Sequence, residues 1–294
     1  MLKRTRSFLV LVMLLMTVTM SAQVTTATMS GKVTAQDEPI IGATIVAIHE
    51  PSGTRYGTVT NVSGQFNLQG MRTGGPYKVE ISYVGYQTAI YKGINLLLGE
   101  NYVLNVSLKE SSELLDEVVV TASKESNMKS DRAGAIMNAN RDMISNTPTI
   151  SRSISDIMRL SPQGADVGNG FAVGGGNYRQ SFVTVDGAAF NNTFGLGGNL
   201  PANGSPISLD ALEQVTVAVT PFDVRQSGFT GGAINAVTRS GDNQFRGTAY
   251  MYFNNENLKG SKVDDYELLR SKAQYYTYGA SFGGPIIKDK LFFF

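Results

Sequence analysis

Few side chains of this sequence have the types and spacing that chemistry requires. His49 is the only histidine, and the 294 residues include no cysteine. The usual zinc sites need several His or Cys ligands, so we expect no metal site. Gly279-Ala280-Ser281-Phe282-Gly283 has the Gly-x-Ser-x-Gly spacing, but it lies within an alternating, strand-like run and not at a strand-to-helix turn, and one histidine is a poor basis for a hydrolase triad. We therefore expect no catalytic residues, no cofactor and no enzymatic activity.

Three other short motifs have simpler interpretations as loops and turns. Gly174-Gly175-Gly176-Asn177 lacks the Gly-Lys-Ser/Thr ending of a phosphate-binding loop. Asp186-Gly187 follows an apolar run and is typical of a tight turn. Asp264-Asp265 is interpreted as part of a solvated loop. The function must therefore be inferred from the architecture of the chain.

Composition and the first residues indicate an exported, β-rich protein. Charged residues make up only 17 % of the chain, and 32 residues are glycine. Lys3, Arg4 and Arg6 precede an apolar run at residues 8–20, which is shorter than the ~20 residues that a spanning helix needs. We predict a signal peptide at residues 1–22, cleaved after Ala22. The net charge of +1 gives no electrostatic reason to expect nucleic-acid binding.

Residues 28–108 predict a small antiparallel β-sandwich. Short runs rich in Val, Ile, Tyr and Thr alternate there with clusters of Gly, Pro, Asp and Ser. About seven short strands at this spacing favour an immunoglobulin-like or transthyretin-like fold. The predicted strands are 28–33, 43–48, 56–60, 65–69, 77–83, 88–91 and 102–108.

Residues 109–124 form a polar connection that contains one β-prone segment. Asp116 and Glu117 precede three consecutive valines, Val118, Val119 and Val120. β-branched residues of this kind favour strands. Two interpretations remain open: the segment is one more strand of the sandwich, or it is a free strand with which the sheet of another protein can pair.

Residues 125–244 combine short helical and strand patterns with glycine-rich loops. Ile154, Ile157, Met158 and Leu160 fall near one face at helical spacing, and Ser161-Pro162 ends this helix. The sequence further predicts strands at 182–187, 215–219 and 233–238 and a helical turn at 209–212.

Residues 245–294 alternate apolar and polar side chains with a period of two. Ala249, Met251 and Phe253 share one face, and Tyr276, Tyr278, Ala280 and Phe282 share a face of the next strand. Strands of about 9–11 residues rich in Tyr and Phe fit the lipid-facing wall of a membrane barrel. The connection 255–273 is long and that near 288–290 is short, which is the loop asymmetry of outer-membrane barrels. An ordinary soluble hairpin is the alternative.

This order of segments resembles the TonB-dependent outer-membrane receptors. More narrowly, it is similar to the Bacteroidetes-type receptors that carry a carboxypeptidase regulatory-like N-terminal domain, including the Oar-like receptors. Gly42-Ala43-Thr44-Ile45 and Gly64-Gln65-Phe66 match landmarks of that domain, although Asn61 stands where the pattern often has Asp. Residues 116–122 resemble the segment that contains or adjoins the TonB box. The plug resemblance lies in 152–156, 184–187, 221–225 and 229–241, and residues 283–294 resemble the start of the barrel.

The resemblance implies a mainly β protein with an α+β plug. Its expected parts are the signal peptide 1–22, a carboxypeptidase regulatory-like sandwich 23–108, a linker 109–124 with a TonB-box-like segment, a plug 125–244 and the first strands of an incomplete transmembrane β-barrel, 245–294. Because the last residues stop inside an alternating pattern, we expect the chain to be the N-terminal part of a longer protein.

The resemblance also implies a receptor that binds a small nutrient and imports it with energy relayed by TonB. Asp116 to Val120 would pair with a strand of TonB, and ligand would be met by plug loops near Asn177, Arg179, Asn191 and Asn192. The expected location is the outer membrane, with membrane lipid around the barrel and the sandwich and plug on the periplasmic side. A surface lipoprotein is a further candidate partner. Iron chelates, cobalamin, glycans and peptides all remain open as cargo.

The alternative from a different class is a secreted or surface-associated β-sandwich protein that acts in binding or adhesion and transports nothing. Such a protein would need no barrel. Further alternating aromatic segments beyond Phe294 in the coding sequence would favour the receptor.

Overall fold

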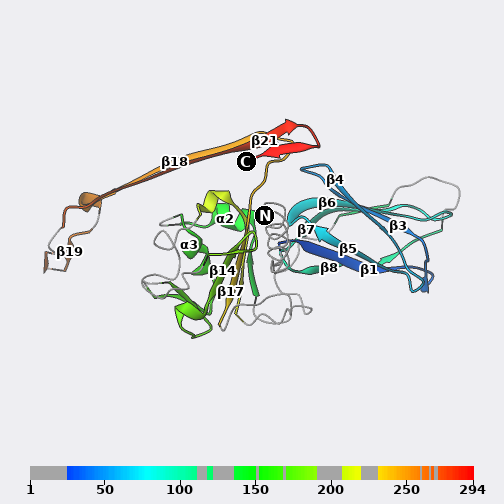
Figure 1. Cartoon of the computed structure of the whole chain (residues 1–294), viewed down its shortest axis with the longest axis horizontal. Helices are drawn as coiled ribbons and strands as arrows, with labels where there is room; N and C mark the ends of the chain where they lie inside the picture. Colours follow the sequence, from blue (N-terminus) through cyan, green and yellow to red (C-terminus); the bar gives the residue numbers. More distant parts are fainter. Residues whose placement is uncertain are drawn as a thin grey trace, which may run out of the picture.

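The computed structural model describes residues 25–110, 118–121, 136–149, 152–167, 170–190, 207–219, 231–258, 260–264, 266–267 and 271–294. The predicted signal peptide lies outside the described residues. Three units follow one another along the chain (Figure 1): a β-sandwich, a mixed unit of strands and short helices at residues 136–238, which we call the central domain, and a long β-hairpin.

The first sheet of the sandwich is built around β1. This strand pairs antiparallel with β2 and β5 and parallel with β8 and β9. The strands are β1 (Ala27–Ala35), β2 (Glu38–Pro39), β5 (Gln65–Met71), β8 (Asn101–Val103) and β9 (Val106–Ser107).

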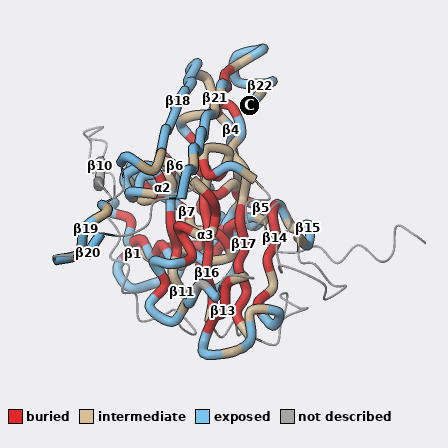
Figure 2. The backbone as a smooth tube through the Cα atoms, turned by 90° about the vertical axis from the view of Figure 1, so that its left-hand side faces the viewer, coloured by how far each residue is buried: buried red, intermediate tan, exposed pale blue. Residues whose placement is uncertain are grey.

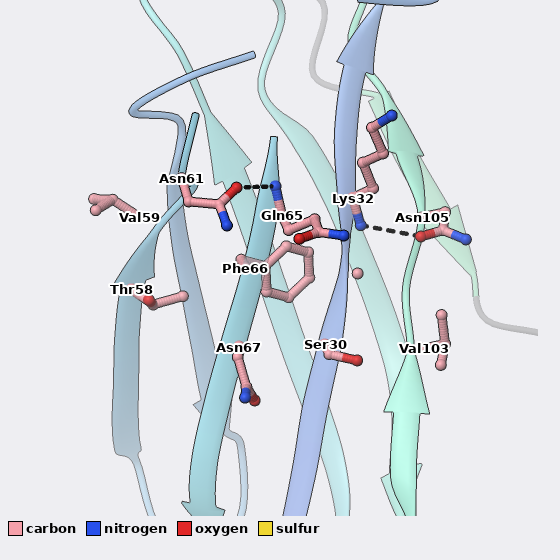
Figure 3. A pocket seen from close by; sticks show the side chains of 11 residues that line it. Ser30, Lys32, Thr58, Val59, Asn61, Gln65, Phe66, Asn67, Val103 and Asn105 are labelled. Atoms are coloured by element: carbon pink, nitrogen blue, oxygen red, sulfur yellow. Dashed lines mark hydrogen bonds between the residues drawn. The ribbon is translucent and has the colours of Figure 1, made fainter. Parts of the chain in front are cut away.

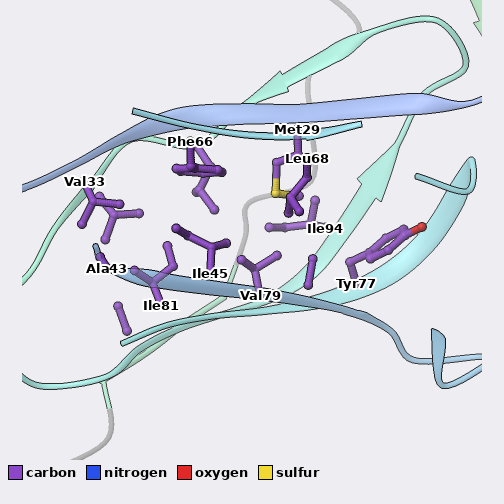
Figure 4. Close-up of a cluster of buried hydrophobic side chains, with 14 of the residues drawn as sticks. Met29, Val33, Ala43, Ile45, Phe66, Leu68, Tyr77, Val79, Ile81 and Ile94 are labelled. Atoms are coloured by element: carbon purple, nitrogen blue, oxygen red, sulfur yellow. The ribbon is translucent and has the colours of Figure 1, made fainter. Parts of the chain in front are cut away.

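The second sheet of the sandwich has the order β10-β7-β6-β3-β4. Its strands are β3 (Thr44–His49), β4 (Thr54–Val59), β6 (Gly74–Ser82), β7 (Ala89–Leu96) and β10 (Val118–Thr121). The two sheets bury a common apolar core. Figure 4 shows Met29, Phe66 and Leu68 of the first sheet facing Ile45 and Val79 of the second. The predicted two-layer sandwich is thus confirmed, but it is not wholly antiparallel, because β8 and β9 run parallel to β1 and β10 runs parallel to β7.

One predicted strand of the sandwich is divided in two. The sequence predicted a continuous strand at 102–108, but β8 ends at Val103 and β9 begins at Val106. Between them the Leu104 N–H donates to the Ser30 carbonyl at 2.8 Å. A Cβ at Gly31 would come closer to the Leu104 carbonyl oxygen than any real contact allows. The close approach of these two backbones therefore needs glycine at position 31.

The central domain is a five-stranded sheet of order β11-β16-β17-β14-β15 with a small second sheet of β12 and β13. Val215 and Val217 of β16 and Ile234 of β17 are fully buried in its core. Figure 2 shows β14, β16 and β17 largely in the buried colour. The strands are β11 (Ile136–Ala139), β12 (Gly164–Asp166), β13 (Phe171–Val173), β14 (Phe182–Val185), β15 (Ala188–Ala189), β16 (Leu212–Ala218) and β17 (Ala233–Thr238).

Two short helices pack against β16. Helix α3 (Ile154–Met158) lies within the predicted helix and buries Ile154, Ile157 and Met158. Helix α2 (Arg141–Asn146) was not predicted, because it has six residues and buries only Ile144 among them. The predicted helical turn is the 3₁₀ turn η2 (Leu209–Ala211), and a further one, η1 (Tyr178–Gln180), follows β13.

The hairpin extends away from the rest of the chain (Figure 1). Strand β18 (Arg246–Asn255) pairs antiparallel with β21 (Gln274–Ile287), and β22 (Leu291–Phe293) folds back on β21. The connection between β18 and β21 holds η3 (Glu256–Leu258) and the short strands β19 (Lys262–Val263) and β20 (Tyr266–Glu267). In Figure 2 both long strands are mostly in the exposed colour. The predicted alternating strands are confirmed.

Candidate functional site

The central domain meets the hairpin through a cluster centred on Arg152, which we call the Arg152 cluster (Arg152, Asp210, Tyr250 and Tyr252). The Arg152 Nε and Nη2 atoms donate to the two carboxylate oxygens of Asp210, with a Nε–Oδ2 distance of 3.1 Å. The Nη1 atom donates to the Tyr252 hydroxyl at 3.2 Å, and the guanidinium carbon lies 4.4 Å from the Tyr250 ring centroid. One guanidinium therefore joins η2 to β18.

The backbone at Arg152 is itself unusual. Its φ of 48° lies in the left-handed region, where a residue other than glycine or asparagine typically costs about 1–3 kcal/mol. The bidentate pair with Asp210 and the contacts with β18 offset this cost. Arg152, Asp210 and Tyr250 line a cavity of about 290 Å³ between the central domain and β18.

These contacts decide which face of the hairpin points to the central domain. Tyr250 and Tyr252 share one face of β18, so Met251 and Phe253 on the alternate positions point away. Met251 lies opposite Tyr278, and Phe253 lies opposite Tyr276. The outer face is apolar and exposed: the relative exposure is 69 % for Met251 and 80 % for Tyr278.

The inner face of the hairpin is more polar. Thr248 and Ser281 exchange a hydrogen bond of 2.6 Å across the two strands. Gly279 lies opposite Tyr250, and an added Cβ there would come within 2.5 Å of the tyrosine ring. Glycine at position 279 thus leaves the space in which Tyr250 lies over the strand and meets Arg152.

The sandwich is attached to the end of the hairpin where the connection is short. The Asn243 N–H donates to the Pro51 carbonyl of the sandwich at 3.0 Å. The Asn243 amide also bonds reciprocally with Asp289: Nδ2 donates to the carboxylate at 2.8 Å, and the Asp289 N–H donates to Oδ1 at 2.9 Å. Asp289 belongs to the turn between β21 and β22, so the sandwich, the chain leading into β18 and this turn meet at one junction.

The sandwich also contacts the central domain directly. The Leu98 N–H donates to Oε1 of buried Gln214 at 3.2 Å, and the Asn138 amide donates to the Glu100 carboxylate at 2.6 Å. A polar cleft of about 410 Å³ lies beside these contacts and is lined in part by Arg72, Glu213 and Arg239. Burial, and then the charge of Arg141, lower the pKa of Arg239.

Of the predicted partner-binding segment, the structure describes the backbone of Val118–Thr121. Asp116 and Glu117 lie outside the described residues. Val118, Val119 and Val120 form β10, which runs parallel to β7 at the edge of the second sandwich sheet. The segment is therefore a strand added to the sandwich, which is one of the two arrangements that the sequence left open. Its role as a partner-binding strand stays a prediction.

Of the predicted ligand contacts, Asn177 and Arg179 lie on the exposed turn η1, whereas Asn191 and Asn192 are outside the described residues. The Asn177 side chain accepts from the Arg179 N–H at 3.0 Å and so caps the turn. The Arg179 Nε donates to the Tyr178 hydroxyl at 3.1 Å. Their contact with a ligand stays a prediction.

The single histidine, His49, is buried in the sandwich. His49 Nδ1 lies 2.6 Å from the Ser52 hydroxyl, and its ring packs against Tyr77 with centroids 4.9 Å apart. Burial, and then the charge of Arg72, lower its pKa from 6.5 to about 4. Ser52 is completely buried and His49 is nearly so.

A groove of about 590 Å³ crosses the outer face of the first sandwich sheet (Figure 3). Its polar side chains tie the strands together: Asn61 Oδ1 accepts from the Ser63 and Gln65 N–H groups, and Asn105 Oδ1 accepts from the Lys32 N–H at 3.0 Å. Asn61 thus supplies the acceptor oxygen that an aspartate would supply at this turn. In the part of the chain that the structure describes, no cluster of three metal-ligating side chains is found. No helix there is long and apolar enough to cross a membrane.

The Arg152 cluster was missed at the level of the sequence. Arg152 falls within the short motif at 152–156, and no motif in the sequence assigns a role to Asp210 or Tyr252. A salt bridge between residues 58 positions apart leaves no periodic signal in one sequence.

Comparisons with known proteins agree with this architecture. Residues 28–109 match the carboxypeptidase regulatory-like domain, and residues 237–294 match an outer membrane beta barrel domain. The TonB-dependent transporter Oar of Myxococcus xanthus is 31 % identical over 151 residues, which is 49 % of this chain and 14 % of that protein. The TonB-dependent receptor SusC of Bacteroides thetaiotaomicron is 29 % identical over 269 residues, which is 86 % of this chain and 24 % of that protein.

The chain therefore spans less than a quarter of the length of either curated relative. Among solved structures, the siderophore receptor PirA from Acinetobacter baumannii aligns over 53 % of this chain and 23 % of that chain, at 20 % identity and a TM-score of 0.40. The two domain matches and the two curated relatives together indicate an outer-membrane protein that is similar to the TonB-dependent receptors with a carboxypeptidase regulatory-like domain.

Proposed function

We propose that the chain forms part of a receptor that binds a small nutrient at the outer membrane and imports it with energy relayed by TonB. In this proposal the central domain, with its flanking residues 125–244, is the plug, and residues 245–294 begin the barrel wall. A surface lipoprotein is a further candidate partner of this receptor.

The observation that carries the proposal is the use of the two faces of the hairpin. The face with Tyr250 and Tyr252 meets the central domain, and the face with Met251, Phe253 and Tyr278 is apolar and exposed. A large exposed apolar face is expensive in water and marks a membrane or partner surface. Strands of an outer-membrane barrel show this alternation, with the apolar side toward lipid. A domain packed on the inner face supports its role as a plug.

The junction at Asn243 supports the proposed orientation. Outer-membrane barrels have short turns on the periplasmic side and longer loops outside. The turn that holds Asp289 is short, and the connection from Glu256 to Ala273 is long. Because the sandwich contacts the short-turn end through Pro51 and Asn243, we place the sandwich and the plug on the periplasmic side.

The same orientation puts β10 where an energy-coupling partner can reach it. The outer membrane has no energy source of its own, so force must be transmitted by a protein that crosses the periplasm. A short strand suits this task, because strand addition uses main-chain hydrogen bonds and needs little sequence. We propose that Asp116 to Val120 pair with a strand of TonB.

The experiment that tests this function is deletion of residues 115–122 in the receptor expressed in its own cells. Energised uptake of the nutrient should be lost, while binding of the nutrient to the same cells should persist. Deletion of an equally long stretch of the β18–β21 connection, residues 259–266, serves as a control that leaves the proposed TonB-binding segment in place. Undiminished uptake after the first deletion would show that TonB does not act through this segment.

A further inference from the structure

The edge of β7 in the sandwich is a strand-binding surface, and the structure shows its occupant. Val118, Val119, Val120 and Thr121 lie opposite Ala89, Ile90, Tyr91 and Lys92 in parallel register. Among the described strands, only β7 pairs with β10. We infer that the TonB-binding segment is paired with β7 of the sandwich when TonB is absent, and that the strand of TonB must displace β7 in order to pair with β10. This inference rests on the proposed function, because it assumes that β10 is the segment that TonB binds.

Ile90 lies opposite Val119 of β10, so the edge of β7 is paired at this position. Ile90 is paired with Glu80 of β6, which places both on the outer face of the sheet, away from the sandwich core. It is nevertheless only 5 % exposed. An uncovered edge beside an apolar side chain is a site of unwanted strand pairing, which native proteins cover. Pairing of β10 with β7 provides such a cover.

The chain connectivity keeps β10 close to β7 even when the two separate. Only residues 111–117 lie between Glu110 and Val118, and so short a segment spans at most about 30 Å. A competitor on so short a tether acts at a high effective concentration. The apparent affinity for TonB is then lowered by the fraction of molecules in which β10 is free.

The described pairing is short, so a partner can reverse it. It joins four residues to the sheet, at one edge. A partner strand that pairs over a longer stretch, including Asp116 and Glu117, forms more main-chain hydrogen bonds than β7 does. Pairing with β7 therefore lowers the apparent affinity of β10 for TonB but does not prevent binding.

A disulfide lock tests the competition, and the absence of native cysteine makes it specific. Neighbouring strands lie about 4.8 Å apart, within the Cα separation that a disulfide bridges. We would introduce Lys92→Cys with Thr121→Cys in the full chain and measure its affinity for the purified periplasmic C-terminal domain of TonB. The oxidised form should bind at least about tenfold more weakly than the reduced form, because β10 can no longer leave β7. Equal affinity of both forms would overturn the inference.

Two controls separate the possible causes. The pair Thr44→Cys with Ser82→Cys locks exposed facing residues of β3 and β6, neither of which pairs with β10, and its oxidation should leave the affinity unchanged. The chain lacking residues 115–122 should not bind TonB at all. If the chain with that deletion binds TonB normally, the proposed TonB-binding segment is wrong. If the deletion abolishes binding but the oxidised Lys92→Cys/Thr121→Cys form binds as well as the reduced form, the segment does bind TonB. In that case β7 does not compete with TonB for it.

Hydrogen exchange gives a second measurement that needs no substitution. Competition predicts that the amides of Ala89 to Lys92 exchange faster when TonB is added, because the β7 edge is uncovered. Addition of the TonB strand to the outer edge of β10 would leave β7 covered, so unchanged or slower exchange there would contradict the inference.

Discussion

Arg152 and Asp210 form a bidentate pair that also fixes the central domain to the first long strand, because the same guanidinium lies against Tyr250 and Tyr252. The side chain of Asp210 is 12 % exposed, and that of Arg152 is 23 % exposed. Hydrogen bonds between charged groups that are shielded from water are stronger than those at the surface. The pair is therefore expected to matter for stability as well as for the position of the hairpin.

Replacement of Arg152 by Gln should lower the free energy of unfolding by about 2–3 kcal/mol, because the Asp210 carboxylate loses its partner. Urea unfolding of the purified chain in detergent measures this change. A double-mutant cycle with Asp210→Asn should give a coupling energy of at least about 1 kcal/mol.

The matched control for this cycle is Arg179→Gln. Arg179 is exposed and contacts the neighbouring Tyr178, so the substitution should change stability by less than about 0.5 kcal/mol. Additive effects of Arg152→Gln and Asp210→Asn would show that the two side chains do not act together.

Gly279→Ala tests how the hairpin presents Tyr250. The new Cβ would lie 2.5 Å from the tyrosine ring, so the ring must turn away from Arg152. We expect a loss of about 1–3 kcal/mol, which is typical of overpacking, measured by the same unfolding experiment. The loss should shrink in a Tyr250→Ala background, where the clash is gone.

Gly260→Ala is the control, because a Cβ at Gly260 meets no atom within 4 Å. A loss from Gly279→Ala that is the same with and without Tyr250 would place its cause elsewhere.

His49 gives the sandwich a pH dependence. Its pKa falls from 6.5 to about 4 on folding, because the buried ring is costly to charge. Between these pH values the unfolded chain binds a proton that the folded chain does not, so stability falls as the pH drops from about 6.5 to 4. The full effect is about 3 kcal/mol. Unfolding of wild type and His49→Gln, compared from pH 7 to pH 4, should show a weaker pH dependence in the variant.

Other titrating groups are common to both proteins in this comparison, so the difference in slope reports His49. Identical slopes would mean that His49 does not become harder to protonate on folding.

Some of this architecture can be read from sequence, and the reasons are local. Met251 and Phe253 alternate with Tyr250 and Tyr252, so the sequence predicts a strand with two unlike faces. It does not predict which face meets the central domain, because Arg152 is 100 positions away from Tyr252 in the chain. The three valines at 118–120 likewise predict a strand. Their pairing with β7 uses backbone groups that every residue but proline has, so no sequence signal names the partner strand.

Short elements were harder to predict for a related reason. Helix α2 is held by its Asn140 cap and by one buried residue, Ile144. A single buried position gives no helical period. The break between β8 and β9 depends on the approach of Leu104 to Gly31, which are far apart in sequence.

Asn243→Ala tests the junction between sandwich and hairpin. It removes the reciprocal bonds with Asp289, and the backbone bond to Pro51 should then open more often. Amide exchange at positions 243 and 289 should accelerate about fivefold to tenfold. Asn67→Ala on the exposed side of β5 should leave this exchange unchanged. Unaltered exchange in the Asn243 variant would show that the junction is held by other contacts.

In the proposed arrangement, the hairpin crosses the outer membrane with the sandwich on the periplasmic side. Single cysteines at Gly260, Lys290 and Gln65 place unique thiols in the long connection, the short turn and the sandwich of a receptor that has none in this part of the chain. A membrane-impermeant maleimide applied to intact cells should label Gly260→Cys at once. It should label Lys290→Cys and Gln65→Cys only after the outer membrane is opened. Labelling of the short turn or the sandwich from outside intact cells would contradict the account.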